Sequence, residues 1–247
     1  MILLRTTLAI ARRVLTELFR DNRARVLVLV APAILMIFAR NLFPTAAQYD
    51  RAGALLIGVF PAFSMCLSGS TALVNERSKG TLEAVLATPA RRIALIAGYI
   101  CAAVVASMAQ AVVTITIAYT VCGLTTASPA WLMFVLAGLS AAFGMSLGVC
   151  VSAISKNEGE ALEFVPGVLI PQLLLTGLVW PIPLMAGWTR RLADFLPLTA
   201  LANTMTSARV HSFGGLPMLY SVVAMVAIIV TAIIVADITI GLRTVSD

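Results

Sequence analysis

Long stretches without a charged side chain constrain the fold of this chain more than any other feature of its sequence. No Asp, Glu, Lys or Arg occurs in residues 26–39, 52–75, 93–155, 164–189 or 210–236. An α-helix needs about 20 consecutive apolar residues to cross a bilayer. Within lipid the backbone must satisfy its own hydrogen bonds, and nothing in these runs alternates as a barrel strand would. The sequence therefore predicts an all-α integral membrane protein.

The uncharged runs also predict how often the chain crosses the membrane. The longest run is broken at residues 123–129 by the turn-like stretch Gly-Leu-Thr-Thr-Ala-Ser-Pro. Six transmembrane helices are expected, at about residues 26–43, 52–74, 93–121, 131–154, 163–180 and 217–240. With their loops they use nearly all of the 247 residues, and only 11% of residues are charged, against about 25% in soluble domains. A single membrane domain, residues 1–247, is predicted, without a catalytic soluble domain.

The distribution of Lys and Arg predicts the orientation of the chain. With the N-terminus in the cytoplasm, the cytoplasmic side receives Arg5, Arg12, Arg13, Arg20, Arg23, Arg25, Arg77, Lys79, Arg91, Arg92, Lys156 and Arg243. The outer side receives Arg40, Arg51, Arg190, Arg191 and Arg209. We therefore expect a multi-pass protein of the cell (plasma or inner) membrane with cytoplasmic N- and C-termini. Topology and contact with anionic membrane lipids account for the net charge of +6, so no nucleic-acid partner is expected.

The first 22 residues have the pattern of an amphipathic helix rather than of a span. At 100° per residue, one face carries the apolar residues Leu4, Leu8, Ala11, Leu15 and Leu18, and the arginines cluster on the other side. This pattern predicts an N-terminal helix, residues 4–22, that lies in the cytoplasmic interface. The alternative is an arginine-rich segment that only sets the topology.

The loop between the second and third expected spans, residues 76–92, is rich in charges of both signs. Its charged start gives way at Gly80 to a predicted short helix, residues 81–87, with Glu83 in the first turn, where the helix dipole favours an anion. Pro89 follows and ends the helix. We interpret the loop as a docking surface for a cytoplasmic partner. The alternative is a solvated charged loop.

This loop resembles the signature of the ABC-2 type permeases, the membrane subunits of ATP-driven exporters. The resemblance rests on Glu76-Arg77, on Gly-Thr-Leu-Glu at residues 80–83 and on Leu-Ala-Thr-Pro at residues 86–89. Residues 195–200, Phe-Leu-Pro-Leu-Thr-Ala, are similar to the stretch before the last span in that family. In size and general sequence character, the chain resembles permeases of the daunorubicin and multidrug-resistance type.

The resemblance implies an assembly and a set of functional residues. It implies a coupling helix in residues 76–92, docked on an ABC ATPase subunit through Glu76, Arg77, Lys79, Gly80, Thr81, Leu82, Glu83, Leu86, Pro89, Arg91 and Arg92. It implies a re-entrant outer segment, residues 182–209, between spans five and six. Two permease copies, identical or related, would pair with two ATPase subunits. Spans two and five would line the path, with Phe60, Phe63, Ser64, Met65, Gln172, Thr176 and Trp180 as cavity candidates.

The ATPase activity is expected on a separate partner chain. The only lysines, Lys79 and Lys156, lie outside any Gly-x-x-x-x-Gly-Lys-Ser/Thr loop that could cradle phosphates. No cofactor is therefore expected on this chain, and ATP and Mg²⁺ are expected on the partner. The second cytoplasmic loop, around Lys156, Glu158, Glu160 and Glu163, is a lesser docking candidate.

The expected function is export of a hydrophobic or amphipathic small molecule or lipid, with no catalytic residue and no metal site. The four cysteines show no metal-ligand spacing. Gly-Met-Ser-Leu-Gly at residues 144–148 matches the nucleophile-elbow pattern of hydrolases, but Ser146 falls within an expected span rather than a strand-turn-helix. A secondary transporter or a non-transporting scaffold subunit remain the alternatives. No carboxylate is placed at the bilayer midplane, where a secondary transporter would need one.

Overall fold

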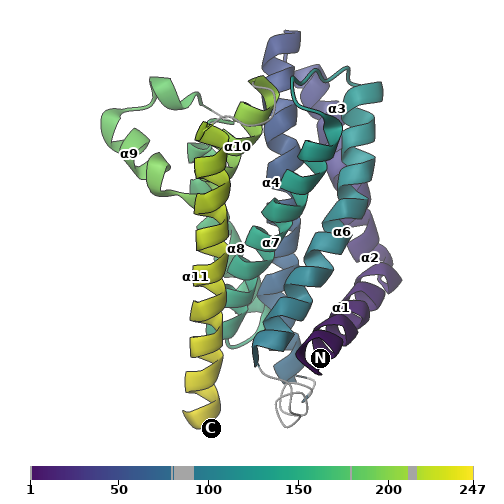
Figure 1. Cartoon of the computed structure of the whole chain (residues 1–247), viewed down its shortest axis with the longest axis vertical. Coiled ribbons are helices and arrows are strands. Elements are labelled where there is room, and N and C mark those ends of the chain that lie inside the picture. The colour runs from purple at the N-terminus through teal and green to yellow at the C-terminus, as the bar shows by residue number, and fades with distance from the viewer. Residues whose placement is uncertain (1, 79, 81–91, 179, 211–215, 247) are drawn as a thin grey trace.

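The computed structural model describes residues 2–78, 80, 92–178, 180–210 and 216–246, and this part of the chain holds helices and loops without a strand. The elements are α1 (Ile2–Arg20), α2 (Asn22–Arg25), the π-helical turn η1 (Val26–Val30), α3 (Ala31–Leu42), α4 (Ala46–Ser78), α6 (Arg92–Thr120), α7 (Ala130–Ile154), α8 (Glu158–Leu175), the 3-10 turn η2 (Ile182–Leu184), α9 (Gly187–Phe195), α10 (Pro197–Val210) and α11 (Leu216–Ser246). The all-α fold class is confirmed for these residues. The start of α1 and the end of α11 lie at the same end of the bundle (Figure 1).

Among the described residues, four helices are long and apolar enough to cross a membrane: Ala46–Ser78, Ala94–Thr120, Ala130–Ile154 and Val222–Thr239. The first expected span is shorter, an apolar helix at Val28–Leu42. Charges at Arg25 and Arg40 limit its uncharged stretch to about 21 Å at 1.5 Å per residue, against about 30 Å of hydrocarbon. The expected count of six spans is therefore not confirmed.

The fifth expected span, residues 163–180, differs most from the prediction. Its helix α8 begins at Glu158 and ends at Leu175, because Gly177 takes a positive φ of 84° that terminates the helix. Proline commonly breaks a helix, and the sequence predicts interruptions at Pro166 and Pro171, yet both lie inside α8 without ending it. Both prolines are exposed, so their rings displace no packed neighbour.

Helices α4 and α7 form the centre of the bundle and approach each other closely. A Cβ atom at Gly144 would overlap the carbonyl oxygen of Ala62, and one at Gly148 would overlap the carbonyl oxygen of Cys66. On the other side of the contact, a Cβ at Gly69 would lie 2.8 Å from the carbonyl oxygen of Met145. The glycines of both helices therefore bring the two backbones into direct contact, as small residues do in membrane helix pairs.

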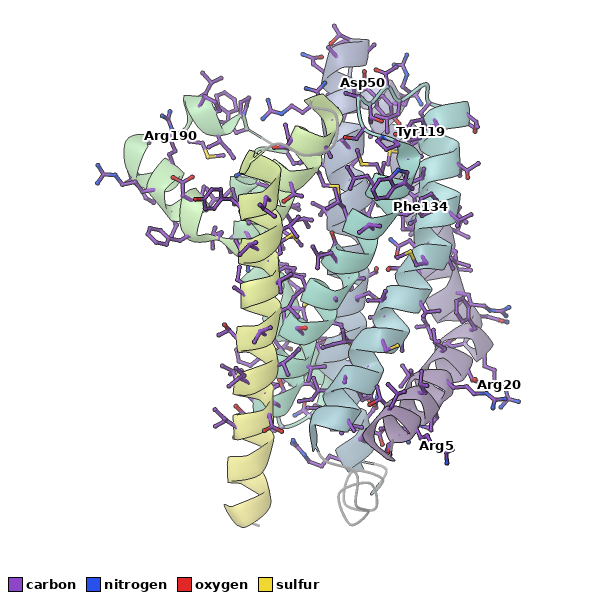
Figure 2. All side chains as sticks on the ribbon, in the orientation of Figure 1. Arg5, Arg20, Asp50, Tyr119, Phe134 and Arg190 are labelled. Atoms are coloured by element: carbon purple, nitrogen blue, oxygen red, sulfur yellow. The ribbon has the colours of Figure 1, made fainter. Side chains whose placement is uncertain are left out.

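The N-terminal helix α1 lies obliquely against one side of the bundle (Figure 1). Its inner face packs on α6, where a Cβ at Gly98 would meet Ile10 at 2.6 Å, and Ile10 and Ala11 are buried. Arg5 and Arg20 point away from the bundle (Figure 2). The predicted amphipathic helix is thus present, although Leu4 and Leu8 of its apolar face are exposed.

The opposite end of the bundle is closed by short elements. The turn predicted at residues 123–129 joins α6 to α7 and begins at Gly123, whose φ is 69°. Thr125 is held by Asp50 of α4, which accepts hydrogen bonds from the backbone N–H of Thr125, at 3.1 Å, and from its hydroxyl. Asp50 and Tyr119 lie together at this end of the bundle (Figure 2). The expected outer segment, residues 182–209, forms η2, α9 and α10 there, and its re-entry into the membrane stays a prediction.

Candidate functional site

The end of α4 meets α1 and α6 at a buried carboxylate. Glu76 lies in the last turns of α4 and is only 6% exposed. Its Oε1 accepts hydrogen bonds from Nη2 of Arg13 on α1 and from the hydroxyl of Tyr99 on α6, the latter at 2.8 Å. A carboxylate in a poorly hydrated place needs such partners. The three residues, named here the Glu76 junction, therefore tie the end of α4 to both neighbouring helices.

The residue after Glu76 joins the two loops on this side. Nη1 of Arg77 donates to the backbone carbonyl of Ser155, at 3.2 Å, in the connection between α7 and α8. That connection is itself capped: Asn157 Oδ1 accepts from the N–H of Glu160 at 2.9 Å, and the Glu160 carboxylate accepts from the N–H of Lys156 at 2.7 Å. The two bonds are similar to a capping box, with Glu160 accepting from the residue before the N-cap, and they fix the start of α8. The starts of the two loops proposed to face a partner therefore lie side by side.

A cavity of about 410 Å³ opens beside the Glu76 junction. Arg13 and Glu17 of α1, with Asp21 directly after this helix, line one wall, and Ser68, Asn75 and Glu76 of α4 line another. Arg13 lies 4.0 Å from Glu17 as well as bonding Glu76. The cavity thus combines carboxylates with one arginine, and its acidic groups outnumber its basic ones.

The predicted docking residues are only partly described. Glu76 is buried within the protein rather than displayed on its surface, because Arg13 and Tyr99 satisfy its carboxylate. Gly80 has a φ of 66°, a left-handed conformation that favours glycine, and Arg92 begins α6. The other predicted docking residues lie outside the described residues: Lys79, Thr81, Leu82, Glu83, Leu86, Pro89 and Arg91. Their docking role stays a prediction.

The predicted path residues of α4 divide between two faces. Phe60 and Phe63 are half-buried, and Phe63 packs with Val165 and Leu169 of α8. Ser64 donates to Oε1 of Gln110 on α6 at 3.0 Å, and Met65 is 1% exposed in the core shared with α6 and α7. The structure therefore brings Phe63 towards α8 and turns Ser64 and Met65 into the bundle.

The predicted path residues at the end of α8 differ in exposure. Gln172 and Thr176 are buried; Gln172 donates to the carbonyl of Val168 at 3.1 Å, and Thr176, directly after α8, donates to that of Leu173 at 2.7 Å. Trp180 is exposed. None of the seven predicted path residues lines the cavity beside the Glu76 junction. Their role in a path between copies stays a prediction.

Three residues of these contacts were not singled out by the sequence pattern. In the sequence, Arg13 contributes only to the charge distribution that predicts the orientation of the chain. Tyr99 is one aromatic residue within a long apolar run. Gln110 is the single amide side chain of residues 93–121, and its depth in that run was a usable signal. It is 1% exposed, and its Nε2 has no hydrogen-bond partner among the described residues.

The hydrolase-like pattern around Ser146 has no catalytic geometry. Ser146 lies inside the continuous helix α7, is buried, and its hydroxyl donates to the carbonyl of Ala142 at 2.7 Å. A nucleophile elbow requires a sharp turn between a strand and a helix. The residues at 144–148 therefore serve helix packing.

Comparison with known proteins adds two similarities. A family model described as ABC-2 type transporter matches residues 5–210, from the start of α1 to the end of α10. The curated protein "ABC transporter G family member 20" of Dictyostelium discoideum is 28% identical over 145 residues. The match covers 59% of this chain and 20% of that protein, so the chain spans about one fifth of this relative's length.

Proposed function

The chain belongs to the ABC-2 type transporter family, and we propose that it is the permease subunit of an ATP-driven exporter. The observation that carries this proposal is the family match through α1, the bundle and the α8–α10 segment. The four long apolar helices among the described residues support a multi-pass membrane protein, as a permease must be. The proposed substrate is a hydrophobic or amphipathic small molecule or a lipid, moved out of the cytoplasm.

Loop 76–92 is the proposed docking site for the ATPase subunit, where ATP and Mg²⁺ would bind. The Glu76 junction supports a mechanical role for this loop, since α1 and α6 hold the end of α4 from two sides. Arg77 adds a link to Ser155, next to the second loop proposed as a lesser contact. Movement of a docked ATPase would therefore reach α4 and the start of α8 together.

Two permease copies with two ATPase subunits are the proposed assembly. The translocation path would lie between α4 and α8 of the copies, with Phe60 and Phe63 from α4 and Gln172, Thr176 and Trp180 from the α8 region at its wall. Exposed apolar side chains on α8, Phe164, Ile170 and Leu174, support contact of this helix with lipid or with a second copy. Ser64 and Met65 would lie behind the residues that line the translocation path.

Charge reversal in the loop tests the docking assignment. Glu83→Lys should abolish ATP-dependent transport and stimulation of the ATPase subunit while membrane insertion continues, because the anion in the first turn of the coupling helix would be replaced by a cation. Asp194→Lys on α9, an exposed carboxylate at the other end of the bundle, is the matched control. Unchanged transport in Glu83→Lys would remove the docking role of the loop.

The energy source separates the exporter from a secondary transporter. Transport by the reconstituted complex should require ATP and should persist when ionophores collapse proton and sodium gradients. The purified chain alone should hydrolyse no ATP, and turnover in a clean preparation would contradict the split between permease and ATPase. Transport that stops with the gradients would favour the secondary transporter.

A further inference from the structure

A second cavity lies at the end of α4 opposite the Glu76 junction. It measures about 230 Å³ and is enclosed by the first turns of α4, the connection from α3 and the segment that follows α8. Its lining includes Phe43, Gln48, Arg51, Leu55, Gly177 and Leu178. One cation, one amide and several apolar side chains therefore share a single small space.

The guanidinium of Arg51 is under-satisfied in this cavity. Its Nη2 donates one long hydrogen bond, at 3.4 Å, to the carbonyl of Gly177. Its Nε is buried without an acceptor, and the described residues offer Arg51 no ion pair. A buried donor without a partner is costly, and more so on a charged group. The site therefore favours an added anion.

Among the described residues, no carboxylate forms an ion pair with Arg51. The adjacent carboxylate, Asp50, is committed to Thr125, accepting from both its backbone N–H and its hydroxyl. The next cation, Arg40, lies 5.6 Å from the ring centroid of Tyr49. Among the described residues that line the cavity, Arg51 is the only charged one, and its positive charge attracts an oxyanion.

Gly177 preserves the space around the guanidinium. Its φ of 84° is a left-handed conformation, and a Cβ there would lie 3.3 Å from Nη2 of Arg51 and 3.2 Å from Ile182. Because glycine has no side chain, the segment after α8 passes close to Arg51 without displacing it. Arg51 therefore stays in the lining of the cavity, beside Gly177 and Leu178.

The chemistry of the lining identifies the class of ligand. Arginine binds phosphate with two parallel hydrogen bonds, and the amide of Gln48 can donate a further one. Phe43, Leu55 and Leu178 offer apolar contact that a free ion cannot use. Trp180, two residues after Leu178, is exposed, and tryptophan is enriched at membrane interfaces. We propose that this cavity binds the phosphate group of an anionic lipid, with Arg51 as the main contact.

Native mass spectrometry of the full chain in detergent tests this proposal. Phosphatidylglycerol and phosphatidylcholine with identical acyl chains are titrated separately, and inorganic phosphate forms a third arm. Wild-type protein should bind at least one phosphatidylglycerol more tightly than phosphatidylcholine. Arg51→Gln should weaken that binding about ten- to a hundredfold, the loss expected for a charge-assisted hydrogen bond. Arg51→Lys, which keeps the charge but not the paired geometry, should fall between them.

Two further variants separate this cavity from other arginines. Arg191→Gln, which changes an exposed arginine of α9, should leave the affinity unchanged. Gln48→Leu, at an exposed rim position, should weaken phosphatidylglycerol binding severalfold without a folding defect. Equal affinity in wild type, Arg51→Gln and Gln48→Leu would overturn the site. Inorganic phosphate binding as tightly as the lipid would overturn the lipid assignment.

Discussion

Replacement of Gly144 by alanine tests the backbone contact between α4 and α7. In a helix interior, alanine is favoured over glycine by about 1 kcal/mol, so a spacious position would become more stable. At Gly144 the new Cβ would overlap the carbonyl oxygen of Ala62 and lie 2.7 Å from its carbonyl carbon and its Cα. These are backbone atoms, so no side chain can rotate out of the way. The two effects therefore oppose each other.

The magnitudes predict that the steric effect is the larger one. Overpacking a close-packed interior costs about 1–3 kcal/mol, and a backbone obstacle places Gly144→Ala near the upper end. After subtraction of the gain in helix propensity, the expected net loss in unfolding free energy is about 2 kcal/mol. Gly148→Ala should behave similarly, since its Cβ would lie 2.8 Å from the N of Ser70.

Gly167 and Gly138 provide matched controls for this prediction. Gly167 lies inside α8 with no atom within 4 Å of the added Cβ, so Gly167→Ala should be neutral or up to about 1 kcal/mol more stable. At Gly138 the obstacle is the terminal methyl of Met108, at 2.6 Å, which can swing aside. Gly138→Ala should therefore lie between the two extremes.

Equilibrium unfolding of the purified chain measures these differences. Detergent micelles with increasing SDS unfold the protein, and helix content by circular dichroism reports the transition. The reasoning predicts the order Gly167, Gly138, then Gly144 and Gly148, from most to least tolerated. If Gly144→Ala were as stable as wild type, α4 and α7 would not touch through their backbones.

Two other contacts make predictions that the same unfolding assay checks. Ser152→Ala removes a hydroxyl that accepts from two backbone amides of α4, at 2.9 and 3.1 Å, and should cost about 1 kcal/mol; Ser140→Ala, which loses only a bond within its own helix, should be near neutral. Arg13→Gln should cost about 1–3 kcal/mol, less than for a fully buried pair because Arg13 is 37% exposed. In a double-mutant cycle with Glu76→Gln, additive losses would refute direct coupling of the pair.

The sequence predicted best the helices that are bounded by charged residues or by a clear turn. Helices α6 and α7 lie between the charged loop at 76–92, the turn at 123–129 and the charged start of α8, so apolar length and local turn residues were sufficient. The helix α8 ended earlier than predicted because one backbone conformation, at Gly177, stops a helix inside an uncharged run. Hydropathy carries no information on that conformation.

The candidate site was predictable only in its location. The family signature identified the end of α4, but its pattern could not show that Glu76 turns inward. Its partners, Arg13 and Tyr99, lie 63 and 23 residues away in sequence, and such pairings arise from packing. Periodicity along one helix likewise could not decide that Met65 and Phe63 belong to different faces of α4.

The backbone contact of α4 with α7 has a consequence for where motion can occur in this protein. Two helices that interlock through Gly69, Gly144 and Gly148 can translate and tilt only as one rigid body, because any sliding brings carbonyl oxygens into collision. The contact of α4 with α8 is made by a small set of side chains around Cys66, Val165 and Leu169. In the proposed exporter, conformational change should therefore be a hinge-like displacement of α8 against an undivided α4–α7 block.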